Sequence, residues 1–282
     1  MVTRLKNQVY QRSGDRPILI DYFFEEHTQH QPVIIFCHGY KGFKDWGCWD
    51  VMATAFAKAG FFFLKFNFSH NGGTMDQPID FPDLDAFAQN NYTQELIDLG
   101  DVIDMAYAEN FPHADKIDTS TITLIGHSRG GGITLIKAKE DSRVTSLITL
   151  ASVADYKERF PKGEALKQWR ENGVFYVKNG RTKQQMPHKY QFYTDFIEHE
   201  ERLTISRAAK KLKIPYLIIH GTNDPTVSFS SAEKIHEWAK NSELYPIENA
   251  NHVFGSSHPW HKKSLPDHLN QAIQASLKFL NI

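Results

Sequence analysis

The chain has 282 residues, of which 41% are hydrophobic and 23% charged, and its formal net charge is −1. This composition is typical of a soluble globular protein, and the small, well-mixed charge excludes nucleic acid or an anionic membrane surface as the principal partner. The N-terminus lacks the apolar segment of a signal peptide, and no apolar run approaches the roughly 20 residues that span a bilayer. We therefore expect a cytoplasmic protein.

Short apolar runs alternate with a helix-like segment in the first part of the chain. Runs without polar alternation are typical of strands that are buried on both faces of a parallel sheet. Residues 49–60 instead place their apolar side chains at helical spacing and end at Gly60, a common C-terminal signal. We predict strands at 18–26, 33–39 and 61–69, a helix at 49–60, and a glycine- and proline-rich loop at 70–83.

The same alternation continues through the rest of the chain. An amphipathic helix is predicted from about Tyr92 to Asn110, with Asn91 as its N-terminal cap. Further strands are predicted at 121–126, 144–152, 215–221 and 244–248, and further helices at 131–140, 231–241 and 267–280. This alternation predicts an α/β fold with a mostly parallel central sheet and helices on both faces.

One segment breaks the pattern. Residues 153–212 are rich in Lys, Arg, Glu, Gln and aromatic side chains. Within this segment, Asn179-Gly180 separates two extended runs of residues 174–186, which predicts a β-hairpin. We therefore expect residues 1–152 and 213–282 to form the core, and 153–212 to be a small cap inserted over the edge of the sheet.

A candidate nucleophile lies where the strand 121–126 meets the next helix. Gly126-His127-Ser128-Arg129-Gly130 fits the pattern G-x-S-x-G, which places a serine on a sharp strand-to-helix turn. The flanking glycines permit such a turn, and the strained backbone exposes the hydroxyl above the carboxyl ends of the strands. The alternative is a glycine-rich turn that contains an incidental serine.

A serine hydroxyl needs a base to remove its proton, and the base needs a carboxylate to orient it. For this type of turn, the acid and then the histidine follow the serine in the chain. Asp224 lies in the polar loop after the strand 215–221, and His252 lies in the loop after the strand 244–248. We predict Ser128, Asp224 and His252 as a catalytic triad; the alternative for Asp224 is an ordinary turn residue before Pro225.

Ester hydrolysis also needs N–H donors for the oxyanion. The first candidate is the backbone N–H of Arg129, directly after the serine. The second is the N–H of Tyr40, in the loop after the strand 33–39, where Gly39 and Gly42 let the backbone approach closely. The alternative for His38-Gly39 is a plain strand-to-loop turn.

Four segments of the chain together resemble the α/β-hydrolase family: HGYKGF, GHSRGG, HGTNDPTV and NHVFG. The resemblance spans about residues 18 to 280 and implies that Ser128, Asp224 and His252 act as the triad. The short HG-x-x-G loop and the small cap are most similar to the branch of dienelactone hydrolases and cinnamoyl or feruloyl esterases. A dehalogenase of similar fold is disfavoured, because its nucleophile position would hold an aspartate.

Arg129 departs from many relatives, which carry Gln or Met after the nucleophile. Its guanidinium is expected to form a structural ion pair with an acid of the cap or of the 70–85 loop; the alternative is contact with an anionic substrate. The sequence NFSHNGG (67–73) also departs from the Arg-Gly-His-Gly-like pattern of many relatives.

The resulting hypothesis is a serine hydrolase that cleaves small-molecule esters of small acyl or aromatic acids through an acyl-enzyme intermediate. The same groups would serve a thioesterase or an amidase, and a non-catalytic ligand-binding protein of this fold is the remaining alternative. This mechanism requires neither a metal nor an organic cofactor, and no Cys/His cluster has zinc spacing. Nothing in the sequence sets an oligomeric state.

Overall fold

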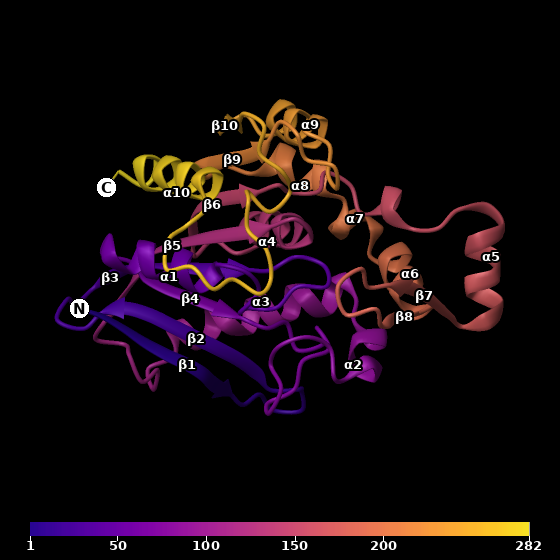
Figure 1. Cartoon of the computed structure of the whole chain (residues 1–282), viewed down its shortest axis with the longest axis horizontal. Helices are drawn as coiled ribbons and strands as arrows, with labels where there is room; N and C mark the ends of the chain where they lie inside the picture. The colour runs from indigo at the N-terminus through magenta and orange to yellow at the C-terminus, as the bar shows by residue number, and fades with distance from the viewer. Residues whose placement is uncertain (282) are drawn as a thin grey trace.

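A central sheet carries the fold in the computed structural model, which describes residues 1–281 (Figure 1). The strand order among these residues is β1-β2-β4-β3-β5-β6-β9-β10. β2 pairs antiparallel with β1 and β4, and the remaining neighbours are parallel, which confirms the predicted mostly parallel sheet. The strands are β1 (Val2–Tyr10), β2 (Ile18–Glu25), β3 (Gln31–Cys37), β4 (Phe62–Phe66), β5 (Ile117–His127), β6 (Val144–Leu150), β9 (Tyr216–Gly221) and β10 (Ser242–Ile247).

Helices cover both faces of this sheet because its central strands are apolar on both sides. In β3, Val33 and Ile35 pack into one buried cluster, while Ile34 and Phe36 pack into the other. The first cluster includes α3 (Tyr92–Tyr107), α4 (Arg129–Glu140) and α9 (Ser230–Trp238), and the second includes α1 (Trp49–Lys58) and α10 (Asp267–Phe279). As predicted, Asn91 caps α3, where its side chain accepts a hydrogen bond from Gln94 N. Among residues 1–281, no helix has both the length and the apolar character needed to cross a membrane.

The strand β1 was not expected from the sequence. Its residues are mostly half-buried or exposed, and it pairs only with β2 at the edge of the sheet. The pairing register shifts between Leu5 and Gln8, where Asn7 has a φ of 54°. Because neither face of this edge strand is fully covered, its side chains lack the apolar run or alternation that marks the inner strands.

Much of the segment between β6 and β9 protrudes from the rest of the fold, while its last helix lies beside α4 (Figure 1). It contains a short 3₁₀ turn (Lys157–Arg159), α5 (Gly163–Asn172), β7 (Val174–Lys178), β8 (Gln185–Lys189), α6 (Gln191–Glu198), α7 (Glu200–Leu203) and α8 (Ile205–Lys211). β7 and β8 form an antiparallel hairpin. Its turn is longer than a two-residue Asn-Gly connection: Asn179 N donates to Gln184 O at 2.8 Å, and Lys183 N donates to Asn179 O at 3.0 Å. We call residues 153–212 the cap, as proposed from the sequence.

The cap contacts the body on several sides. β8 packs against α2 (Leu84–Gln89), α6 packs against α3, and α8 packs against α4. These contacts place the cap next to the carboxyl ends of the parallel strands, where the loops that carry the candidate site residues also lie.

Candidate active site

Ser128 lies at the turn between β5 and α4 with φ 56° and ψ −117°, a strained backbone conformation for a residue with a side chain. The glycines on either side are required by close packing. A Cβ on Gly126 would lie 2.4 Å from Gly130 O, and a Cβ on Gly130 would lie 2.5 Å from the carbonyl oxygens of Cys37 and His38. The close packing around the two glycines therefore holds Ser128 in backbone angles that a residue with a side chain rarely adopts.

The three predicted side chains meet at one edge of the sheet. His252 Nδ1 lies 2.7 Å from Asp224 Oδ2, and His252 Nε2 lies 3.0 Å from Ser128 Oγ. A carboxylate only accepts hydrogen bonds, so Nδ1 carries the proton and Nε2 accepts from the serine hydroxyl. The arrangement leaves the histidine oriented and unprotonated on the side that faces the hydroxyl.

Asp224 is held by more than the candidate base. Its Oδ1 accepts hydrogen bonds from Thr226 N at 2.8 Å and Val227 N at 2.9 Å. Burial alone would raise the pKa of Asp224, but hydrogen bonds from His220, His252 and the Val227 N–H hold it well below its usual range. The carboxylate therefore stays ionised, as an acid that orients a histidine must.

His220 contacts the candidate acid, a contact that the sequence did not reveal. The residue is fully buried in β9. Its Nε2 lies 2.9 Å from Val227 O and 3.2 Å from Asp224 Oδ2, the same oxygen that faces His252 Nδ1. The signal was a histidine four residues before the acid, at the point where the strand ends.

His127 fixes the loop that carries His252. Its Nε2 lies 2.9 Å from the carbonyl oxygen of His252, and the two rings lie 4.9 Å apart. Burial, followed by the nearby His252, lowers the pKa of His127 to about 3, so the ring is neutral and donates through Nε2. The residue before the nucleophile thereby holds the backbone of the candidate base.

The loop after β3 passes close to the serine. A Cβ on Gly39 would lie 3.0 Å from Ser128 Cβ, and Gly42 N donates to Gly39 O at 3.0 Å to close a turn around Tyr40. The N–H of Arg129 is the first of α4 and has no acceptor within the helix. Both candidate oxyanion donors thus belong to backbone adjacent to Ser128.

The side chain of Tyr40 connects this loop to the cap. Its hydroxyl donates to His188 Nε2 at 2.7 Å, and the carbonyl oxygen of His188 accepts from Trp169 Nε1 at 2.8 Å. Burial, with smaller contributions from Arg129 and Lys41, lowers the pKa of His188 to about 3. A neutral His188 is the acceptor that the tyrosine hydroxyl needs.

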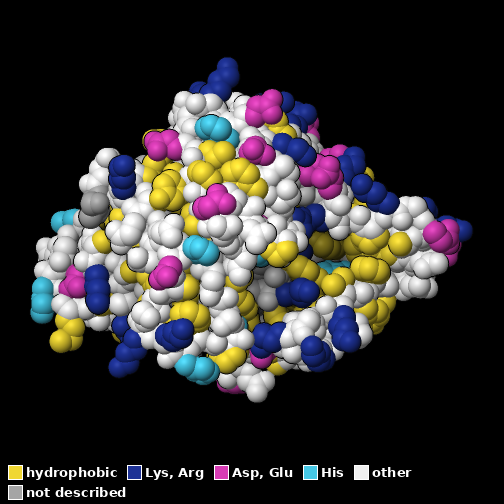
Figure 2. Space-filling view, turned by 45° about the horizontal axis from the view of Figure 1, so that its top comes forward, with side chains coloured by type: hydrophobic (Ala, Val, Ile, Leu, Met, Phe, Trp, Pro, Cys, Tyr) yellow, Lys and Arg dark blue, Asp and Glu magenta, His cyan; other side chains and the backbone are white. Residues whose placement is uncertain are grey.

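Two cavities meet at Ser128. The larger, about 460 Å³, lies under the cap, and the smaller, about 260 Å³, lies beside Trp46, Trp49 and His127. Tyr40, Lys41, Ser128 and His252 line both. Figure 2 shows hydrophobic side chains gathered in a hollow beside the protruding cap, with Lys and Arg side chains around it. The candidate groups therefore border a cavity on two sides.

The Arg129 guanidinium forms an ion pair, but with a different element from those expected. Its Nη1 lies 3.2 Å from Glu95 Oε1, and Glu95 belongs to α3 rather than to the cap or the 70–85 loop. Its Cζ also lies 4.3 Å from the centroid of the Tyr40 ring. Because α3 packs beside α4, an acid on its buried face reaches the arginine directly.

The oxygens of Asp21, Asp45 and Asp50 lie close together, as the ligands of a metal ion would. Two buried lysines reach into the same space: Lys44 Nζ lies 2.7 Å from Asp21, and Lys65 Nζ lies 2.6 Å from Asp21 and 2.8 Å from Asp50. The carboxylates are thus neutralised by ammonium groups, and the cluster ties the loop after β3 to β2 and β4.

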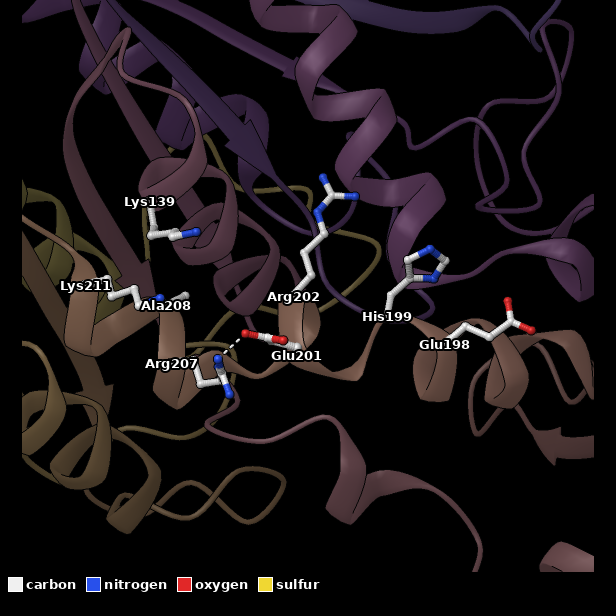
Figure 3. A pocket seen from close by; sticks show the side chains of 8 residues that line it. All are labelled: Lys139, Glu198, His199, Glu201, Arg202, Arg207, Ala208 and Lys211. Atoms are coloured by element: carbon white, nitrogen blue, oxygen red, sulfur yellow. Dashed lines mark hydrogen bonds and ion pairs between the residues drawn. The ribbon is translucent and has the colours of Figure 1, made fainter.

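A second concave region lies away from the serine, between α4, α6, α7 and α8. This surface cleft has a volume of about 370 Å³ (Figure 3). Its side chains point in different directions, and both of its arginines have carboxylate partners: Arg202 pairs with Glu140 at 2.9 Å, and Arg207 pairs with Glu201. The cleft has charge but no nucleophile with a base, so the candidate active site is the one at Ser128.

Comparison with known proteins agrees with this fold. The family model described as alpha/beta hydrolase fold matches residues 32–185, more than half of the chain. The protein therefore belongs to the alpha/beta hydrolase fold family, as the sequence motifs implied.

Several solved structures are similar over nearly the whole chain. Est1E from Butyrivibrio proteoclasticus, in complex with ferulic acid, has a TM-score of 0.74 and 19% identity, covering 97% of this chain and 98% of that chain. Alpha/beta hydrolase domain-containing protein 10 from mouse has a TM-score of 0.71 and 17% identity, covering 97% and 98%. A putative dienelactone hydrolase from Klebsiella pneumoniae has a TM-score of 0.62 and 13% identity, covering 100% and 99%. At these identities the similarity concerns the fold.

Proposed function

We propose that this protein is a serine hydrolase that cleaves carboxylic esters of small acyl or aromatic acids. The observation that carries the proposal is the continuous hydrogen-bonded path from Ser128 Oγ through His252 to Asp224, at the meeting point of two cavities. A serine alone would be a weak nucleophile, and this path supplies the base and the acid that activate it.

The proposed reaction proceeds through an acyl-enzyme. His252 Nε2 takes the proton as Ser128 Oγ attacks the ester carbonyl, and Asp224 stabilises the imidazolium that forms. The backbone N–H groups of Tyr40 and Arg129 hold the oxyanion, a contribution of about 3 kcal/mol of barrier for one donor. His252 then protonates the leaving alcohol, and a water activated by the same base releases the acid.

The cap supports the preference for a small or aromatic acyl group. Its contribution to the larger cavity is mainly apolar, from Phe160, Pro161, Trp169, Phe175, Val177 and Phe192. Such a lining favours an aromatic or medium-length acyl group over a polar one. The likeness to Est1E, whose structure has ferulic acid bound, points in the same direction.

The test combines active-site labelling with an activity screen. The wild-type protein should react with a fluorophosphonate probe and should hydrolyse nitrophenyl esters of short acyl chains and hydroxycinnamate esters. Ser128→Ala should lose the label and lower kcat/KM by about 10⁴-fold or more, since it removes the nucleophile. Ser264→Ala, at an exposed serine, is the matched control and should retain both.

An unlabelled wild-type protein, or a Ser128→Ala variant that still carries the label, would favour a non-catalytic binding protein. Preferential turnover of a thioester or an amide of the same acyl group would retain the triad chemistry and reassign the substrate bond.

A further inference from the structure

The larger cavity beside Ser128 combines apolar walls with positive charge. Lys41, Arg129 and Arg159 line it, and no Asp or Glu is among its lining residues. Among residues 1–281, Arg129 has an ion pair with a carboxylate, whereas neither Lys41 nor Arg159 has one. Arg159 is exposed to solvent, whereas Arg129 and the half-buried Lys41 lie against aromatic rings, which attract a cation but do not neutralise its charge.

Arg129 is only partly satisfied by its partner. Of the five N–H groups of a guanidinium, one donates to Glu95 Oε1 at 3.2 Å, and no other protein acceptor within residues 1–281 receives one. The guanidinium is otherwise enclosed by the rings of Tyr40, Tyr92 and Phe192, with its Cζ 4.3, 5.3 and 5.3 Å from their centroids. Its side chain is 12% exposed, so its free donors have only the cavity to face.

Glu95 itself is a weak counter-ion. It is fully enclosed, and burial raises its pKa against the opposing effect of Arg129. Its Oε2 is buried without a hydrogen-bond partner among the described residues. Glu95 therefore offers Arg129 a single oxygen at 3.2 Å, and the remaining N–H groups of the guanidinium are left for a ligand in the cavity.

Lys41 lies between the two cavities and lines both. Its Nζ lies 5.0 Å from the centroid of the Tyr40 ring, and the residue is half-buried. Burial, and after it the charge of Arg129, lowers the pKa of Lys41, which reflects a cation without a compensating anion. An anion in the larger cavity would stabilise the charged form of Lys41 and offset the repulsion between Lys41 and Arg129.

Resting on the proposed ester hydrolysis, we propose that the part of the substrate that occupies the larger cavity carries a carboxylate at the end of an apolar or aromatic spacer. Lys41, Arg129 and Arg159 bind this carboxylate, while the aromatic walls contact the spacer. The substrate class is thus a half-ester of a dicarboxylic acid, in which one carboxyl is esterified and cleaved and the other is free.

Charge recognition of this kind predicts a specific discrimination. A neutral carbamoyl group has nearly the shape of a carboxylate, but it cannot neutralise Lys41 or Arg129. A hydrogen bond to a charged group contributes enough to give the carboxylate a roughly 10- to 100-fold higher kcat/KM than its carbamoyl isostere. The preference should fall at high salt, because the cavity opens to solvent.

The experiment compares two matched substrate pairs on the wild-type protein. One pair is ethyl 4-carboxycinnamate and ethyl 4-carbamoylcinnamate, and the other is monoethyl adipate and ethyl 5-carbamoylpentanoate. The readout is the ratio of kcat/KM for the carboxylate to that for the carbamoyl ester. Lys41→Gln and Arg159→Gln should each lower this ratio several-fold, and Lys234→Gln, at an exposed lysine of α9, should not.

The carboxylate site is overturned if the ratio of kcat/KM is near or below one for both pairs, even if the protein is an active esterase. It is also overturned if neither Lys41→Gln nor Arg159→Gln lowers the ratio. Failure of all four esters together with nitrophenyl acetate would instead count against the proposed function. In that case, calorimetric titration of Ser128→Ala with 1,4-benzenedicarboxylate tests the site by itself. Binding that weakens in the Lys41→Gln background supports the site, and no binding rejects it.

Discussion

The surface cleft of Figure 3 and the larger cavity under the cap both contain positive side chains, but they use them differently. In the cleft, Arg202 and Arg207 each meet a carboxylate, and Lys139 and Lys211 are exposed to solvent. In the cavity, Lys41 and the exposed Arg159 meet none among the described residues, and Arg129 shares one buried acid. A charge that is paired or exposed needs no ligand, whereas the largely enclosed Arg129 and the half-buried Lys41 leave a place for an anion.

Both regions also join the cap to the body. In the cleft, the guanidinium of Arg202 in α7 binds both oxygens of Glu140 in α4, at 2.9 Å each. In the cavity, the Tyr40 hydroxyl donates to His188, and the hydroxyl of Tyr156 in the cap donates to Arg129 O at 2.9 Å. The exposed ion pair holds the cap near α4, whereas the bond to His188 begins at Tyr40, whose N–H is a proposed oxyanion donor. The following predictions test whether this difference in position becomes a difference in function.

The largest expected effect is at the acid of the proposed triad. Asp224→Asn should lower kcat/KM by about 10³- to 10⁴-fold, because an amide can hold His252 in the wrong tautomer and cannot stabilise its positive form. Arg202→Gln in the cleft should change kcat/KM by less than about two-fold, since an exposed ion pair contributes only about 0–1 kcal/mol. Initial rates with a nitrophenyl ester, with circular dichroism to check folding, measure both.

Folded Asp224→Asn protein with activity within about ten-fold of wild type would contradict the triad. A large loss in Arg202→Gln would mean that the cleft, and not only the cavity, controls the reaction.

The second prediction concerns acid stability and again separates the cavity from the cleft. His188 has a pKa of about 3 in the folded protein because it is buried, whereas an unfolded histidine titrates near 6.5. As the pH falls below about 6.5, His188 becomes protonated in the unfolded chain but stays neutral in the folded protein. The folded protein therefore loses stability progressively until the pH reaches the pKa of His188 in the folded state. Between about pH 7.5 and pH 5 the loss should be about 2 kcal/mol for this residue.

His188→Asn should therefore show a smaller decrease in the free energy of unfolding between these two pH values than the wild-type protein. Arg202→Gln, which does not titrate in this range, should keep the wild-type decrease. Urea denaturation at both pH values provides the measurement, and equal decreases in wild type and His188→Asn would refute the assignment of a buried neutral histidine.

The sequence predicted the inner strands of the sheet because their residues carry one strong signal. In β3 and β9, for example, both faces are buried, so the apolar run marks the strand without ambiguity. β1 lacked this signal because an edge strand is held by backbone pairing rather than by a covered face. The short cap helices were also missed: in α5, Trp169 is the buried side chain, so little apolar periodicity exists to read.

In the candidate site, too, some features could be predicted from the sequence and others could not. The positions of Ser128, Asp224 and His252 follow from rules about which loops meet at the carboxyl ends of parallel strands. The contacts of Arg129 with Glu95 and of Tyr40 with His188 do not, because they depend on how α3 packs beside α4 and where the cap settles. Residues 148 positions apart in the chain, as Tyr40 and His188 are, have no local pattern that pairs them.

The smallest expected effect distinguishes two of the connections between cap and body, the Tyr40–His188 hydrogen bond and the Arg202–Glu140 ion pair. Tyr40→Phe removes the hydroxyl that donates to His188 but keeps the ring, so the stacking over Arg129 and the loop backbone should remain. A hydrogen bond of this kind contributes about 1 kcal/mol, and the Tyr40 N–H gains importance as the oxyanion forms. We expect kcat to fall about 3- to 10-fold with KM for a short-chain ester nearly unchanged, because a looser donor costs the transition state more than the bound substrate.

Arg202→Gln also releases the cap on one side, and if it produced the same decrease in kcat, the effect would belong to cap attachment in general. A decrease confined to Tyr40→Phe would instead locate it in the connection between His188 and the oxyanion loop.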